Sequence, residues 1–133
     1  MDFSQNTGSQ QWEADAPFRG RTIRVRVDPS HDAGKREALA AAALKKADTA
    51  WSDIERNLVR SLFALYNDAW SDPDEGFPVL SEVEFLARVT LGTIVVLDEP
   101  DALSLYFDDG ELFGGHLIDL FWADGKMHDA ALA

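Results

Sequence analysis

Residues 51–70, with the sequence WSDIERNLVRSLFALYNDAW, form the most regular pattern in the chain and decide its predicted fold. Apolar side chains recur there at intervals of three and four residues, which is the period of an α-helix. They lie at Trp51, Ile54, Leu58, Leu62, Leu65 and Ala69, with a neighbouring stripe at Val59, Phe63, Tyr66 and Trp70. The opposite face carries Asp53, Arg56, Asn57, Arg60 and Asn67. The stretch is therefore predicted to be an amphipathic helix with a broad apolar face.

A second helical stretch with an alanine-rich middle precedes it, over about residues 35–47. A single helix from 35 to 70 would be about 54 Å long, whereas a compact domain of this length has a radius of gyration of about 14 Å. We therefore expect a break near residues 48–52, where Ser52-Asp53-Ile54-Glu55 fits a capping box. Ser81-Glu82-Val83-Glu84 fits the same pattern and predicts a short helix over about 82–89.

The remaining segments have the alternation of strands. Residues 12–18 and 23–27 alternate apolar and polar side chains around a turn at 19–21, which predicts a hairpin with Pro17 at a sheet edge. Residues 93–97, 103–107 and 116–122 are separated by turn sequences, which predicts an antiparallel meander without long crossovers. The predicted class is α+β, with an antiparallel sheet of about five strands covered on one face by two or three helices. We expect a single domain over residues 12–133 after a flexible polar tail over 1–11.

Composition excludes several kinds of chemistry. The 133 residues contain no cysteine, which excludes disulfides, thiolate metal sites and a cysteine nucleophile. The first residues lack the basic and apolar regions of a signal peptide. The longest apolar run, Ala38–Leu44, is far shorter than the roughly 18 residues of a membrane span. We expect a cytoplasmic protein.

The net charge of −12 is confined to one half of the chain. Residues 71–133 contain fourteen acidic side chains against two basic ones, Arg88 and Lys126. Such a charge repels phosphate backbones and anionic lipids, which argues against nucleic acid or a membrane as the main partner. It would attract a basic protein, although an acidic surface also serves solubility alone. The oligomeric state is not indicated.

One stretch, DDGELFGGH at residues 108–116, combines carboxylates with a histidine. If the chain has a site, we expect it at His116, Asp119, Asp108 and Glu111, where an acid–base pair could form. The stretch fails the calcium-loop template, because Leu105 would be the first ligand. No nucleophile, nucleotide-binding or metal-ligand motif occurs. No catalytic residue, metal or cofactor is therefore predicted, and the glycines are explained more simply by a turn of positive φ and by a bulge or close backbone approach.

Three stretches resemble a known family. They are LYNDAW at 65–70, LSEVEF at 80–85 and LYFDDGELFGGHLI at 105–118. They resemble the bacterial domain-of-unknown-function family 2262, over about Trp12 to the end of the chain, and the aspartate–glycine to glycine–histidine stretch is the most specific part. The resemblance implies no activity and no assigned catalytic residue. Small acidic bacterial domains of this kind are often regarded as candidate immunity proteins, which neutralise secreted toxins.

Two functional hypotheses follow. The first is a non-enzymatic binding protein, an immunity-type inhibitor of a basic toxin protein. Its predicted partner-binding residues are carboxylates of the meander turns: Asp98, Glu99, Asp101, Asp108, Asp109, Glu111 and Asp124. The alternative is a small enzyme or ligand-binding domain centred on His116, which requires a concave pocket with a carboxylate in hydrogen-bond reach. A calcium-binding acidic module is a third possibility.

Overall fold

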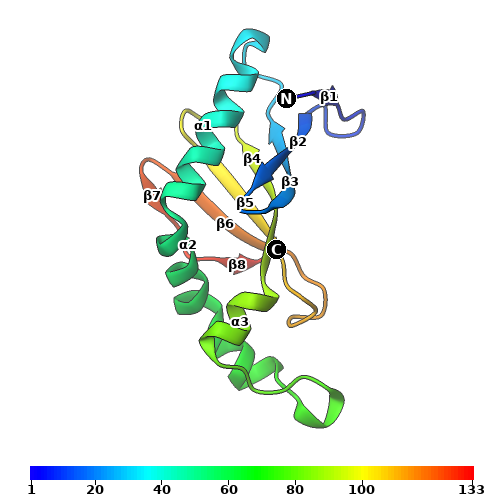
Figure 1. Cartoon of the computed structure of the whole chain (residues 1–133), viewed down its shortest axis with the longest axis vertical. Helices are drawn as coiled ribbons and strands as arrows, with labels where there is room; N and C mark the ends of the chain where they lie inside the picture. The colour runs from blue at the N-terminus through cyan, green and yellow to red at the C-terminus, as the bar shows by residue number, and fades with distance from the viewer.

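A computed structural model describes residues 1–133 and contains one eight-stranded sheet with helices along one face (Figure 1). The strands are β1 (Ser4–Gln5), β2 (Trp12–Phe18), β3 (Arg21–Val27), β4 (Thr90–Val96), β5 (Leu103–Asp108), β6 (Ile118–Ala123), β7 (Lys126–Met127) and β8 (Ala131–Leu132). They lie in the order β1 to β7. β8 pairs with the first residues of β6, and β7 pairs with its last residues. The α+β class is confirmed, but the sheet has more strands than the five expected.

The predicted hairpin is confirmed. β2 and β3 pair antiparallel with Ala14 opposite Val25 and Ala16 opposite Ile23, and all four side chains are buried. β1 pairs only with the first two residues of β2, so Pro17 lies on an edge as expected. Residues 1–11, for which the sequence predicts a flexible tail, thus contribute a short strand.

The expectation of an entirely antiparallel sheet is wrong. β3 and β4 are parallel neighbours, with Val25 opposite Ile94 and Val27 opposite Val96. Parallel neighbours require a long crossover connection, and residues 28–89 provide one. The closely spaced turn sequences that argued against crossovers occur only in the β4–β5–β6 meander, which is antiparallel as predicted.

The crossover is a nearly continuous helical column. It consists of the 3₁₀ turn η1 (Ala33–Lys35), α1 (Arg36–Thr49), α2 (Trp51–Leu58) and two π-helical segments, η2 (Val59–Phe63) and η3 (Tyr66–Trp70). A break does occur within the expected window, at Ala50, but the helical hydrogen bonds continue across it from Lys46 to Ile54. No side chain caps α2, so the capping box expected at Ser52 is absent.

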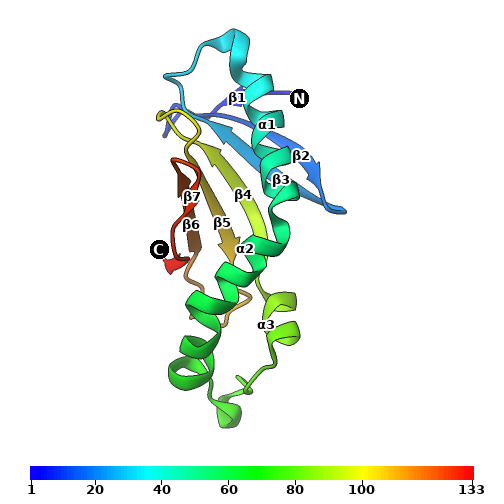
Figure 2. The ribbon, with the colours of Figure 1, turned by 90° about the vertical axis from the view of Figure 1, so that its left-hand side faces the viewer.

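The helical column is longer than a compact domain of this size would allow, because the molecule is elongated (Figures 1 and 2). The helical column runs along its long axis and continues beyond the sheet (Figures 1 and 2). There α3 (Glu82–Arg88) and the 3₁₀ turn η4 (Pro73–Glu75) lie beside its far end. The capping box of α3 is confirmed, since the Ser81 hydroxyl accepts from the Glu84 amide and the Glu84 carboxylate accepts from the Ser81 amide.

The core lies between the column and the sheet. Small side chains of α1 face β3 and β4, and larger ones follow along α2 and its π-helical continuation. The buried apolar residues of the column are Ala40, Ala43, Ala47, Ile54, Leu58, Leu62 and Tyr66. Alanine at the first three positions lets the helix backbone approach the strands closely. None of the helices combines the length and apolar character needed to cross a membrane.

One polar residue of the column is buried against expectation. The helical pattern assigned Asn57 to the polar face, yet its side chain is 1% exposed. Its amide nitrogen donates to the His128 carbonyl at 2.9 Å, and its oxygen accepts from the Ala130 amide at 3.0 Å and from Ser61 at 2.9 Å. Asn57 therefore ties the C-terminal segment to the helix, which is why a buried amide is tolerated here.

We predict that Asn57→Ala lowers the free energy of unfolding by about 1–3 kcal/mol, because a buried amide and a carbonyl lose their partner. Ser61→Ala is the matched control, since it removes one donor from an oxygen that keeps the Ala130 amide. It should cost at most about 1 kcal/mol. Urea denaturation measures both, and equal losses would contradict the assigned role of Asn57.

Candidate binding surface

The loop after β5 is organised by a buried carboxylate. Asp109 is 2% exposed. One of its oxygens accepts from the Glu111 amide at 2.9 Å, and the other accepts from Phe113 at 2.9 Å and Gly115 at 3.0 Å. These backbone donors occupy the carboxylate, so the prediction that Asp109 belongs to a partner-binding surface is wrong. Its function is to fix the loop.

The same loop closes one end of the core. Gly110 has a φ of 59°, and a Cβ there would lie 2.4 Å from the Arg88 carbonyl oxygen, so only glycine fits. The Arg88 guanidinium donates to the Gly110 carbonyl at 3.0 Å. Phe113 is fully buried, with its ring edge-on to Tyr66 and Trp70. The predicted turn glycine is therefore confirmed, and the stretch over residues 108–116 has a structural explanation.

The residues proposed for a catalytic site do not converge. His116 is exposed, and its Nδ1 lies 3.3 Å from the main-chain oxygen of Ala133, with no hydrogen bond to an aspartate or glutamate side chain. Asp108 accepts from the Gly110 amide, and Glu111 is exposed. His116 is not among the residues that line the cavities beside the helices and the β2–β3 hairpin. An enzyme centred on His116 requires a hydrogen bond to a carboxylate, and His116 forms none with an aspartate or glutamate side chain.

Asp119, the fourth candidate residue, lies on the helix-free face of the sheet, opposite Tyr106 of β5. Its Oδ1 is enclosed and has no hydrogen-bond partner in the protein. Burial raises the pKa of Asp119, and the neighbouring Ser104 hydroxyl opposes this rise in part. Asp119 is thus a partly buried carboxylate that forms no hydrogen bond with the other candidates.

Two arginines of the β2–β3 hairpin lie close to acidic side chains of the same hairpin. On the helix-free face, Arg26 lies 3.1 Å from Glu13, and Arg24 lies 3.5 Å from Glu13 and 3.4 Å from Asp15. The Arg26–Glu13 pair is close, although the angle at Nε is unsuited to a hydrogen bond. These arginines therefore do not neutralise the acidic residues of the C-terminal half.

The predicted partner-binding acids fall into two groups at opposite ends of the sheet. Asp108 and Glu111 flank the loop between β5 and β6. The other group, which we call the acidic end, contains Asp98, Glu99, Asp101 and Asp124. It combines the β4–β5 loop with the β6–β7 turn, which the antiparallel meander brings to the same end (Figure 1). All four residues of the acidic end are exposed, and none forms an ion pair.

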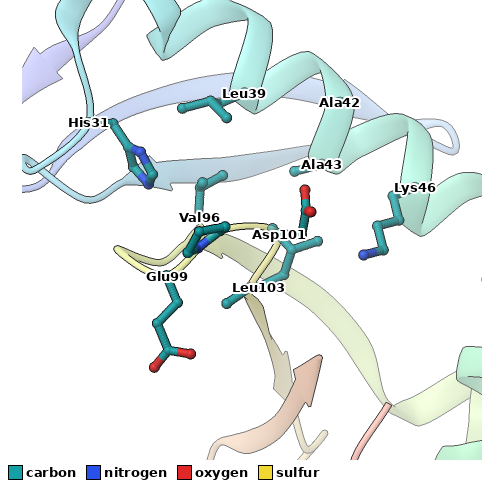
Figure 3. Close-up of a pocket in the computed structure, with 11 residues that line it drawn as sticks. His31, Leu39, Ala42, Ala43, Lys46, Val96, Glu99, Asp101 and Leu103 are labelled. Atoms are coloured by element: carbon teal, nitrogen blue, oxygen red, sulfur yellow. The ribbon is translucent and has the colours of Figure 1, made fainter. Parts of the chain in front are cut away.

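A cavity of about 240 Å³ lies beside the acidic end, between α1 and the β4–β5 loop (Figure 3). Its apolar lining comes from Leu39, Ala42, Ala43, Val96, Pro100, Ala102 and Leu103. Its ionisable lining comes from His31, Lys46, Glu99 and Asp101. Sequence reasoning missed this cavity, because it depends on placing α1 beside a loop more than fifty residues away in the chain. Glu99 and Asp101 supplied the available signal, because both were predicted partner-binding residues and both line the cavity.

The two basic groups of the cavity are held by other contacts. The His31 Nε2 lies 2.5 Å from the Leu97 carbonyl oxygen, and since a carbonyl only accepts, Nε2 carries the proton. The Lys46 ammonium lies over the Trp122 ring, 4.4 Å from its centroid. Lys46 forms no ion pair with Glu99 or Asp101. Both carboxylates at the cavity therefore remain free.

A comparison with models of known protein families identifies the family of this chain. Residues 2–130 match the model described as "Uncharacterized protein conserved in bacteria (DUF2262)". The chain belongs to this family. The resemblance expected from Trp12 onward is confirmed, and the matched residues begin earlier, so that they include β1. Searches of curated proteins and of solved structures found no match.

We predict that Asp109→Ala lowers the free energy of unfolding by about 3 kcal/mol, because three backbone amides lose a charged acceptor. Asp108→Ala is the matched control, as it removes one exposed turn hydrogen bond and should cost at most about 1 kcal/mol. Urea denaturation distinguishes them. If the two neighbouring substitutions cost the same, Asp109 does not organise the loop.

Asp119→Asn should stabilise the protein at neutral pH. Because the pKa of Asp119 is raised in the folded state, wild-type stability falls as pH rises through that pKa. The uncharged amide avoids this loss, so the advantage of the variant should grow from about pH 4, near the usual pKa of an aspartate, to pH 7. Thermal unfolding across this range measures it, and a pH-independent difference would refute the assignment.

Proposed function

We propose that this chain is a non-enzymatic protein-binding domain that engages a basic protein through its acidic end, as an immunity-type inhibitor engages a toxin. The observation that carries the proposal is the set of exposed carboxylates at the acidic end, none of which has an ion-pair partner. Unpaired surface charge is available to an incoming cation, whereas paired charge must first be released.

The charge distribution supports a basic partner. Residues 71–133 hold fourteen acidic and two basic side chains, and in this segment only Asp129 forms an ion pair, with Arg60. A surface charge of one sign raises the association rate with an oppositely charged protein by about 10-fold to 1,000-fold at low salt. Lys126 follows Asp124 closely but forms no ion pair with it.

The acidic end suits binding better than the opposite end of the sheet. At the opposite end, Asp109 is occupied by backbone amides and the loop seals the core. At the acidic end, two separate turns contribute carboxylates and a cavity opens beside them. A partner can therefore meet both charge and an apolar recess there, which is the usual composition of a specific protein interface.

The proposal is tested with two triple variants of equal charge. Asp98→Asn/Glu99→Gln/Asp101→Asn removes three carboxylates from the acidic end. Asp72→Asn/Asp74→Asn/Glu75→Gln removes three exposed, unpaired carboxylates at the far end of the molecule (Figures 1 and 2). Each is used to capture proteins from an extract of the bacterium that encodes the chain, in about 0.1 M and about 1 M NaCl, where the Debye length is about 10 Å and about 3 Å.

We expect wild type and the far-end variant to retain the same basic protein at low salt, and the acidic-end variant to lose it. High salt should release it from both wild type and the far-end variant. The proposal is contradicted if no basic protein is retained at low salt. It is equally contradicted if the two triple variants retain a basic protein to the same extent, because net charge rather than the acidic end would then govern binding.

A further inference from the structure

We propose that the cavity beside the β4–β5 loop receives the side chain of one arginine of the basic partner, with the guanidinium group at Asp101. This inference rests on the proposed function and assigns the chemistry of its central contact. It comes from four observations: the size of the cavity, its apolar lining, its free carboxylates and the contacts that hold its own basic side chains.

Size favours a side chain over a small-molecule ligand. The cavity measures about 240 Å³, whereas sites for drug-sized ligands and cofactors typically measure about 300–1,000 Å³. Pockets that accept a single anchoring side chain are a recurrent feature of protein interfaces, and arginine is among the residues that most often fill them. The cavity also opens directly beside the acidic end.

The lining fits the aliphatic part of an arginine. Leu39 and Ala43 of α1 face Val96 and Leu103 across the cavity (Figure 3). Long cationic side chains bury their methylene groups against such apolar surfaces while the charged head stays near water. An aspartate or glutamate side chain is too short and too strongly hydrated to use this lining.

The free carboxylates select a cation. In Figure 3 the Asp101 carboxylate points toward α1, and the Glu99 carboxylate points away from it. Asp101 therefore lies where a guanidinium entering from solvent would arrive, and Glu99 adds negative charge outside. Asp101 also has a φ of 58°, a left-handed conformation that is uncommon for a residue other than glycine. The turn thus holds Asp101 in this position at a conformational cost.

The basic side chains of the cavity do not oppose the binding of a cation. Lys46 is held over the Trp122 ring, and the His31 ring is held by the Leu97 carbonyl. Neither Lys46 nor His31 pairs with Asp101 or Glu99, so both carboxylates stay available to an incoming cation. Arginine is preferred to lysine because its guanidinium is less strongly hydrated and can form two parallel hydrogen bonds with one carboxylate.

The test uses the full-length protein and two small probes. ¹H–¹⁵N spectra are recorded during titration with Nα-acetyl-arginine amide, and separately with Nα-acetyl-citrulline amide, which has the same length without the charge. We expect saturable shifts with the arginine probe at the amides of Leu39, Ala102 and Leu103, and binding weaker by about tenfold or more with citrulline. Asp101→Asn should weaken arginine binding to a similar extent.

Two further variants separate the cavity from the surrounding charge. Ala42→Phe places a large side chain at the cavity wall without changing any charge. Ala41→Phe makes the same substitution at the neighbouring exposed position of α1, which does not line the cavity. Both carry the same helix-propensity cost. We expect Ala42→Phe to abolish the arginine shifts and Ala41→Phe to retain them.

The inference is overturned if the arginine probe gives no saturable shifts, or if Ala42→Phe binds it as well as Ala41→Phe does. Its failure can be distinguished from that of the proposed function. A basic partner that depends on the acidic-end carboxylates but binds both phenylalanine variants equally would overturn the arginine contact alone. The absence of any basic partner would overturn the proposed function, whatever the titration shows.

Discussion

The close packing of α1 against β3 and β4 is the constraint on which the rest of the structure depends. Ala40, Ala43 and Ala47 are buried at this contact, and a larger side chain there would push the helix away from the strands. The helix can therefore cross the sheet and return the chain to β4, parallel to β3. The same packing sets the width of the cavity, because Ala43 lines it opposite the β4–β5 loop.

The two ends of the sheet are consequently different in character. At one end, the Asp109 carboxylate collects three backbone amides and Phe113 fills the space beneath the loop. At the other end, short turns leave carboxylates in water beside a recess in the surface. Binding is expected at the acidic end, because the buried Asp109 carboxylate already accepts hydrogen bonds from the backbone and cannot contact a partner.

Secondary-structure elements that depend on residues close together in the chain were predictable from the sequence. The hairpin of β2 and β3 follows from alternation, and the start of α3 follows from its capping box, since both patterns involve residues close together in the chain. Parallel pairing of β3 with β4 was not predictable, because nothing local records which strand lies beside another. The length of the helical column was misjudged because the calculation assumed a compact shape, whereas the molecule is elongated (Figure 2).

For the candidate site, too, local features were predictable from the sequence and long-range contacts were not. Asp101 and its neighbours were identified because turn carboxylates are visible in a sequence, but Asp109, in the same kind of turn, is buried as a hydrogen-bond acceptor. The residue type is the same at both positions, so only the surrounding structure distinguishes an exposed aspartate from a buried one. Asn57 illustrates the point for a helix, because its partners His128 and Ala130 lie some seventy residues away. The cavity, which needs α1 and the β4–β5 loop together, left no pattern in the sequence.

The availability of the acidic end rests on its negative charge being exposed and uncompensated. The most direct measurement is the thermal unfolding midpoint as NaCl rises from about 0.01 M to about 0.15 M, where the Debye length falls from about 30 Å to about 8 Å. Because screening relieves repulsion among unpaired carboxylates, the midpoint should rise, and it should rise less when Asp98, Glu99 and Asp101 are neutralised. A midpoint that falls with salt would show that these charges are held in attractive pairs, and would contradict the account.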